Sequence, residues 1–424
     1  MVVMMQKMQN LFNNRNVFYS VIIALTLLFG VFSFLTIKSY SNKEEPKTKE
    51  KVLERETFTT YISDGNGHYK KYTSADGSLY PSGYKYNQGI SYCEDLDGNR
   101  LDIVPTYANN KFTLESDKTA FCYLYFDIIS PAAEELVANG ELWSSGLEGD
   151  GYRYVGSGAY NSETTPSNFI CFGTTDKTEC KNNEAKYMYR IIGVFEGIDG
   201  EQHLKLIKYK QLSLIKSWHS DTKTDTDWVD SDMYTGLNGE YFLTNTTYDY
   251  LQNSTWLNKI EDWTWSAVNT KTRSDSGPDY GNSLTPSEIY LHEMNRSSKS
   301  SSIGEWTTPV AKIGLMYFSD YTLSLGSSAL SITGSIADNY VTLETGWMYP
   351  TNNDITASRS EWTISRNGLY ETENFAWLVS RWWYSPSLST NSLEGMRPVF
   401  YLNSDLVIDS GSGEYSNPYI LRMW

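Results

Sequence analysis

The longest apolar stretch of the chain lies near its start. Residues 17–37 contain no charged side chain. As a helix rising about 1.5 Å per residue, this stretch would reach roughly 31 Å, the thickness of a bilayer's hydrocarbon core. A cleaved signal peptide has a shorter apolar core and ends at small residues, whereas Lys38 and Ser39 follow here. The pattern predicts an uncleaved transmembrane helix at 17–37, with the lipid bilayer as its partner and residues 1–16 as a cytoplasmic tail.

The pattern changes several times after the apolar stretch. Residues 38–56 are polar with interleaved charges, which is typical of a solvated linker. Between 57 and 130, short alternating stretches are separated by Asp-Gly turn signals, which predicts a small all-β module. No chemistry is visible in that module, so it reads as a spacer or stalk. Pro131 followed by good helix formers predicts a connecting helix within 131–150.

Residues 151–424 show a third pattern, in which short strands and two helices are separated by long polar loops. All 13 Trp of the chain lie in or just before this region, after residue 142. We expect an irregular α+β domain. The predicted strands are 187–195, 203–207, 312–318, 362–365, 375–379 and 396–403, and the predicted helices are 231–242 and 246–260.

The chain has four cysteines, all after the apolar stretch. An even number on one side of a membrane predicts disulfides formed in an oxidising compartment. This favours the outside of the cell for the C-terminal domain, although the Lys and Arg residues that follow the predicted helix favour the inside. Nearness in sequence favours the pairs Cys93–Cys122 and Cys171–Cys180, and four buried free thiols are the alternative.

The formal net charge of −16 bears on the possible partners. A strongly acidic chain without a basic stripe repels phosphate backbones, so we expect no nucleic-acid partner.

Five short motifs carry a resemblance to known proteins. Their order resembles a family of uncharacterised bacterial surface proteins, which in turn look like the sulfatase-modifying, formylglycine-generating-type branch of the C-type-lectin fold. The resemblance implies a C-type-lectin-like domain over 151–424. With the segments before it, the predicted fold class is α+β with an N-terminal transmembrane helix and a small all-β stalk. The motifs are Tyr187–Val194, Leu237–Tyr241, Gly314–Tyr317, Trp362–Arg366 and Glu394–Leu402.

The last of these motifs contains two residues with individual predictions. Gly395 is expected to provide a special backbone angle at the entry to the last long strand. Arg397 lies between apolar strand residues, which predicts a buried, paired guanidinium.

The sequence departs from the chemistry of the enzymes on this fold. No cysteine follows Cys180, no clustered His motif occurs, and the sugar-lectin tripeptide Glu-Pro-Asn is absent. We therefore expect no catalytic residues, no cofactor and no metal. The isolated His203, His219 and His292 are expected to be structural or at the surface. The acidic loop 221–232 is expected to be a solvated loop before a helix, and a calcium site there is the less favoured alternative. Asp232 is expected near the N-terminus of that helix.

An aromatic cluster before the last strand is the best candidate site from sequence. Such clusters form rigid recognition surfaces, although core filling is the alternative. The predicted ligand-binding residues are Trp377, Arg381, Trp382, Trp383, Tyr384, Asn391 and Glu394.

Together these patterns predict a membrane-anchored extracellular binding or adhesion protein. Its ligand would be an extracellular glycan, peptide or protein. One alternative is a cell-wall or glycan-processing enzyme, with Glu261 and Asp262 near Trp263, or Glu305, as its carboxylates. The other alternative is a pilus-like structural subunit.

Overall fold

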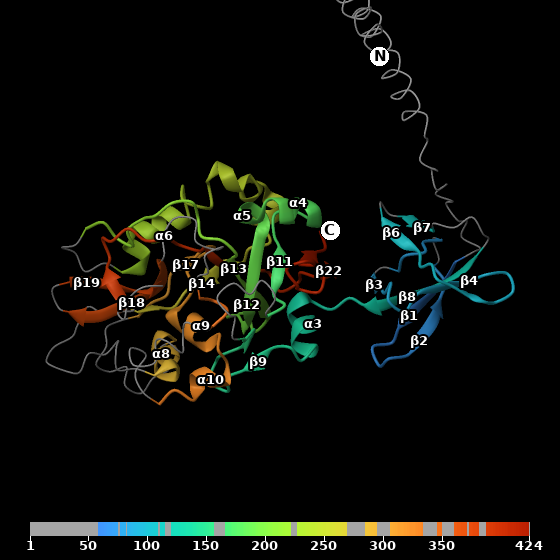
Figure 1. The fold of residues 1–424 in the computed structure, drawn as a ribbon, viewed down its shortest axis with the longest axis horizontal. Coiled ribbons are helices and arrows are strands. Elements are labelled where there is room, and N and C mark those ends of the chain that lie inside the picture. The colour runs from blue at the N-terminus through green and yellow to red at the C-terminus, as the bar shows by residue number, and fades with distance from the viewer. Residues whose placement is uncertain are drawn as a thin grey trace, which may run out of the picture. The chain divides into compact units, whose positions relative to one another are not determined.

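The chain forms two compact units, which meet in sequence between Ile129 and Ser130 (Figure 1). The computed structural model describes residues 58–423 except for 75–76, 82, 109–110, 115–119, 157–165, 222–226, 269–284, 295–305, 334–345, 350–359, 371–372 and 381–386.

The N-terminal unit is built on a six-stranded sheet of order β2-β1-β8-β4-β5, with β3 also paired to β8. The pairing of β1 with β8 is parallel, and the other pairs are antiparallel. A separate hairpin joins β6 and β7. The strands are β1 (Phe58–Ser63), β2 (Tyr69–Tyr72), β3 (Tyr84–Tyr86), β4 (Tyr92–Glu94), β5 (Arg100–Leu101), β6 (Thr106–Ala108), β7 (Lys111–Thr113) and β8 (Phe121–Ile128).

The alternation of buried and half-buried side chains along β8 shows which face of this sheet covers the core. Cys122, Leu124 and Phe126 are fully buried, whereas Tyr123 and Tyr125 between them point to the other face. Cys122 lies directly opposite Cys93 on β4, and the two form a disulfide. This pairing confirms the first predicted disulfide.

The C-terminal unit is built on an eight-stranded sheet of order β21-β13-β12-β11-β23-β22, extended by β10 and β9 beside β12. Its central strands are buried along almost their whole length, because other elements cover both faces (Figure 1). The strands of this sheet are β9 (Trp143–Ser144), β10 (Tyr152–Arg153), β11 (Phe169–Cys171), β12 (Met188–Glu196), β13 (Gln202–Lys208), β21 (Val399–Tyr401), β22 (Ile408–Ser410) and β23 (Tyr419–Leu421).

Short helices and small sheets surround the central sheet. The helices are α3 (Ala132–Ala138), α4 (Lys177–Asn182), α5 (Glu184–Tyr187), α6 (Asp232–Leu237), α7 (Ser254–Leu257), α8 (Pro286–Glu293), α9 (Phe318–Leu323) and α10 (Ser327–Leu330), with 3-10 turns η2 (Trp228–Asp230) and η3 (Thr246–Gln252). The outer strands are β14 (Trp263–Thr264), β15 (Ala267–Val268), β16 (Trp306–Thr307), β17 (Val310–Ala311), β18 (Ser360–Tyr370), β19 (Glu373–Ser380) and β20 (Ser387–Ser389).

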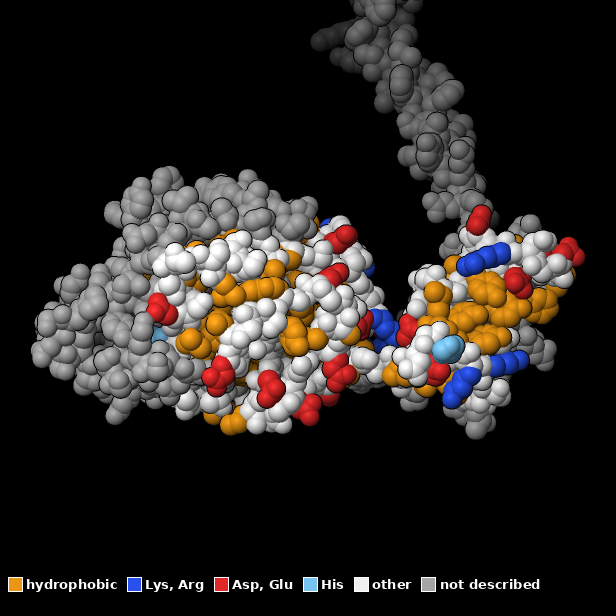
Figure 2. Space-filling view, turned by 90° about the horizontal axis from the view of Figure 1, so that it is seen from below, with side chains coloured by type: hydrophobic (Ala, Val, Ile, Leu, Met, Phe, Trp, Pro, Cys, Tyr) orange, Lys and Arg blue, Asp and Glu red, His pale blue; other side chains and the backbone are white. Residues whose placement is uncertain are grey.

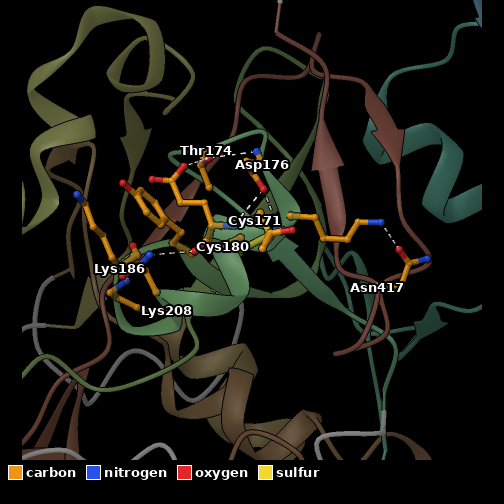
Figure 3. The surroundings of a disulfide bond; sticks show 12 residues. Cys171, Thr174, Asp176, Cys180, Lys186, Lys208 and Asn417 are labelled. Atoms are coloured by element: carbon orange, nitrogen blue, oxygen red, sulfur yellow. Dashed lines mark hydrogen bonds between the residues drawn. A yellow bond between two sulfur atoms is a disulfide. The ribbon is translucent and has the colours of Figure 1, made fainter. Parts of the chain in front are cut away.

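A second disulfide ties α4 to the central sheet. It joins Cys171, at the end of β11, to Cys180 in α4 (Figure 3), and so confirms the second predicted pair. Asp176 begins the helix by accepting hydrogen bonds from the backbone N–H groups of Thr178 and Glu179, at 2.7 Å and 3.0 Å. The covalent bond and the cap together fix this short helix.

The predicted fold class is wrong. The described part of the chain is strand-rich with few helices, and its longest α-helix, α8, has eight residues. Eight residues reach only about 12 Å, far short of a bilayer core. No described helix is long and apolar enough to cross a membrane, and residues 17–37 lie outside the described residues.

Most of the predicted strands form, and the exceptions have local causes. The stretch 312–318 contributes only an isolated bridge at Gly314, because the carboxylate of Asp320 accepts from the N–H of Tyr317 and begins α9 there. The predicted helix 246–260 breaks into η3 and α7, because Asn253 adopts an extended backbone and caps α7.

The two predictions for the last motif have different outcomes. Arg397 is buried and bonds Glu361 through two nitrogens, with Nη2 2.5 Å from Oε1 and Nε 2.8 Å from Oε2, as expected. Gly395 does not adopt a positive φ. A Cβ there would instead lie 2.5 Å from the end of the Gln211 side chain, which would have to move to admit a larger residue.

Candidate functional site

A buried network of charges lies between the central sheet and α9. Arg153 on β10 contacts Asp320 on α9 at 2.9 Å and Asp150 at 2.8 Å. Lys205 on β13 contacts the other oxygen of Asp320 at 2.5 Å. All four side chains are at most 3 % exposed. Two cations therefore face two carboxylates, and little of any of the four side chains is exposed.

Glycines bring β10 close enough to place Arg153 in this network. A Cβ on Gly193 of β12 would lie 2.1 Å from the carbonyl oxygen of Tyr152, and one on Gly151 would lie 2.0 Å from that of Val194. Only the absence of both side chains allows the two backbones this approach. In the resulting pairing of β10 with β12, Arg153 lies opposite Gly193.

Aromatic rings surround the ammonium group of Lys205. Its nitrogen lies 4.5 Å from the ring centroid of Tyr317, 5.3 Å from that of Tyr401 and 5.4 Å from that of Phe195. Trp263 stacks on Tyr401 with a centroid distance of 3.6 Å and an angle of 9°. Because cations are attracted to ring faces, this cage adds to the stabilisation that Asp320 gives.

Burial and pairing act in opposite directions on these groups. Burial lowers the pKa of Lys205, and Asp320 opposes that shift. Burial alone would raise the pKa of Asp320, but Lys205 and Arg153 outweigh it and lower the pKa. Both cations therefore favour the ionised form of Asp320.

A cavity of about 580 Å³ opens above this network. Its volume lies within the range of small-molecule sites. Aromatic side chains line its walls, among them Phe195, Trp263, Tyr290 and Tyr401. Its inner end is the charge network. The hairpin between β12 and β13 forms one side of the opening, with Ile198 at its tip 96 % exposed.

Carboxylates dominate the more exposed part of the lining. Four acids line it, while its two cations, Arg153 and Lys205, are already paired. His203 is buried there, with Nδ1 2.8 Å from the carbonyl oxygen of Leu402. Lys312 contacts Asp262 at 3.3 Å and offsets its charge, so the other three acids carry the negative charge that disfavours anions at the opening. The four acids are Glu196, Asp199, Glu261 and Asp262.

No family model, curated protein or solved structure matches this chain. The resemblance to bacterial surface proteins therefore stays a prediction, and function is inferred from geometry alone.

Three of the seven sequence-predicted site residues lie in the part of the chain that the structure describes. Trp377 is 5 % exposed and packs against Phe318 with ring centroids 4.5 Å apart, which is core filling. Asn391 is exposed, and Glu394 is half-buried with its backbone paired to Lys216. The remaining four residues lie outside the described residues: Arg381, Trp382, Trp383 and Tyr384.

The acidic loop gives no sign of a metal site in the part that the structure describes. Asp225 lies outside that part, and no group of three or more His, Cys, Asp or Glu within it could hold a metal ion. Asp232 is in the first turn of α6, as expected, and accepts from the backbone N–H of Ser220 at 2.8 Å.

The sequence did not predict the cavity, but three residues considered as a possible enzyme site line it. Glu261, Asp262 and Trp263 were considered as the site of a glycan-processing enzyme, and all three line it. Lys205 carried a usable signal, because a charged residue in the middle of a buried apolar strand needs a partner. Glu305, the other carboxylate considered, lies outside the described residues.

Proposed function

We propose that this chain is a binding protein that works outside the cytoplasm and holds a small neutral or amino sugar in the cavity beside β12 and β13. The observation that carries the proposal is the combination of aromatic walls, an inner end of paired charges and an acidic opening around one cavity of about 580 Å³.

The wall chemistry suits a sugar. One face of a sugar ring carries C–H groups that pack on aromatic rings, and its hydroxyls donate hydrogen bonds to carboxylates. Trp263 and Tyr401 provide stacked rings, and Glu261 is adjacent to Trp263 in sequence. A phosphate or carboxylate ligand would face the acids at the opening without an unpaired cation in the described lining to offset them.

The inner end of the cavity supports binding rather than turnover. Asp320 is held by two cations and by the N–H of Tyr317, so its oxygens are committed to structure. A site with fixed partners is preorganised, which lowers the free energy lost on ordering when a ligand binds.

The two disulfides support a place outside the cytoplasm. Structural disulfides persist in oxidising compartments and are rare in the cytosol. No free cysteine remains. Both observations suit a protein that meets its ligand in the cell envelope or beyond it.

Replacing Trp263 with alanine tests the site. We expect the affinity of the full chain for N-acetylglucosamine, glucosamine or glucose to fall about tenfold, because a stacking platform is lost. Isothermal titration calorimetry with each sugar measures this. Trp143→Ala is the matched control, since Trp143 is a half-buried tryptophan that does not line the cavity.

Three outcomes would contradict the proposal. One is no binding of any of the three sugars by the wild-type chain. Another is equal loss in Trp263→Ala and Trp143→Ala. The third is release of product from a bound oligosaccharide that stops in Glu261→Gln, since this would indicate the enzyme alternative.

A further inference from the structure

The outer face of the N-terminal sheet carries a row of tyrosines. Register places Tyr61 of β1 opposite Tyr125 of β8, and Tyr123 of β8 opposite Tyr92 of β4. Tyr69 of β2 touches the end of the row. All five are half-buried, and none belongs to the core on the other side of the sheet. We call these five residues the tyrosine face.

Contacts between the rings of the tyrosine face hold each ring in its orientation. Tyr61 and Tyr125 stack with centroids 5.0 Å apart at 14°, and Tyr92 and Tyr123 stack at 4.9 Å and 26°. Tyr69 meets Tyr125 edge to face at 5.2 Å. Centroid distances of this size indicate offset stacking, in which each ring leaves part of its face uncovered. Figure 2 shows apolar and aromatic side chains gathered on the surface of this unit.

Charged groups of both signs border the tyrosine face, among them Lys71 opposite Tyr61 and Glu94 beside Tyr123, and several are paired within the module. The hydroxyl of Tyr69 donates to Asp127 at 2.5 Å, and Asn87 donates to the other oxygen of Asp127 at 2.6 Å. The guanidinium of Arg100 lies 4.8 Å from the ring centroid of Tyr92. A partner therefore needs no charge of its own to be complementary.

The area of the tyrosine face is too small for a stable protein interface. A fully buried aromatic side chain buries about 150–250 Å², and these are half-buried already, so five rings offer on the order of 500 Å². A standard protein interface needs about 800 Å² from each partner. The net charge of −16 argues against nucleic acid, which also stacks on aromatic rings.

We propose that the tyrosine face binds an uncharged polysaccharide chain, which lies flat across β1, β8 and β4. Partly uncovered rings in a row match successive sugar rings, and the tyrosine hydroxyls offer hydrogen bonds to sugar hydroxyls. This site is separate from the cavity of the C-terminal unit. The module that the sequence predicts as a stalk would then be a second binding module.

Co-sedimentation of the full chain with insoluble chitin and cellulose tests the proposal. We expect wild-type protein to bind at least one of them. The double variant Tyr61→Ala with Tyr125→Ala should bind at least about tenfold more weakly, because it removes the central stack. The double variant Tyr61→Phe with Tyr125→Phe keeps both rings and should keep most of the affinity.

Controls separate this site from folding and from the cavity. Leu96→Ala removes an exposed apolar side chain elsewhere on the same module and should bind like wild type. Trp263→Ala measures any contribution of the cavity: a loss in this variant as large as in the tyrosine-to-alanine double variant would place polysaccharide binding in the cavity instead. Retention of the Cys93–Cys122 disulfide in the alanine variant shows that the module still folds.

Other results would overturn the proposal. They are no binding to either polysaccharide, equal binding by wild type and the alanine double variant, or self-association of the wild-type chain that the same variant abolishes. The last would show that a second copy covers the tyrosine face.

Discussion

Replacing Asp320 with alanine is expected to destabilise the C-terminal unit by about 3–5 kcal/mol. The change leaves Lys205 and part of Arg153 buried without the carboxylate that both contact. It also removes the acceptor for the N–H of Tyr317, where α9 begins. Urea unfolding followed by tryptophan fluorescence measures the loss, because all 13 Trp lie in this unit.

A surface pair provides the matched control for Asp320. Asp409 contacts Arg422 at 3.0 Å, but it is 46 % exposed. Solvent screens such pairs, so Asp409→Ala should change the free energy of unfolding by no more than about 1 kcal/mol. Equal losses in the two variants would show that the buried network contributes no more than a surface ion pair.

A second substitution shows where the loss comes from. In Asp320→Ala, much of the expected loss is the free energy of an unpaired buried ammonium rather than the worth of the pair. Adding Lys205→Met removes that charge and keeps much of the volume. The double variant should therefore be more stable than Asp320→Ala alone. Simple additivity of the two losses would contradict a coupled network.

Elements with strong local signals were predictable from sequence. The strands at 187–195 and 203–207 formed because their apolar runs can only be buried, and both disulfides joined the cysteines nearest in sequence. Arg397 was recognised as a buried charge by its apolar neighbours, although its partner Glu361 was not foreseen. A local pattern therefore indicates burial better than it indicates a partner.

The cavity could not be foreseen because its parts are far apart in sequence. Asp320 lies 115 positions from Lys205 and 167 from Arg153. No local pattern brings such residues together, since their meeting depends on how β10, β13 and α9 pack. The burial of Trp377 could not be foreseen for a related reason, because the alternation around it does not show which side faces the core.

The tyrosine face was missed although the small all-β module at 57–130 was predicted. The parallel pairing of β1 with β8 decides which residues of that module share a face. Parallel neighbours are never adjacent in sequence, because a crossover must join them. Only that register sets Tyr61 beside Tyr125.

Two neighbouring groups at the end of α8 are expected to give opposite pH dependences of stability. Burial raises the pKa of Glu293 to about 7, although hydrogen bonds from Ser319 and Ser365 act against it. Burial lowers the pKa of the adjacent His292 to about 4. The carboxylate of Glu293 accepts from the N–H groups of Phe318 and Ser319 at 3.0 Å each, so it joins α8 to the start of α9.

The signs follow from proton binding. Between about pH 4.5 and 7 the folded chain holds a proton on Glu293 that the unfolded chain has released, so stability falls as pH rises, by roughly 3 kcal/mol over the full shift. Between about pH 4 and 6.5 the unfolded chain holds a proton on His292 that the folded chain lacks, so stability rises with pH by a similar amount. The two slopes overlap and largely cancel in the wild type.

Each single variant should therefore show a dependence of stability on pH that is largely cancelled in the wild type. From about pH 5 to about pH 8, Glu293→Gln should gain stability by roughly 2 kcal/mol, because only His292 still titrates. His292→Asn should lose roughly 3 kcal/mol over the same range, because only Glu293 does. Urea unfolding at both pH values measures all three proteins. Asp320 and Lys205 also act on Glu293, but they are present in every variant, so their effect is common. Parallel pH profiles for the three proteins would show that neither group has a shifted pKa in the fold.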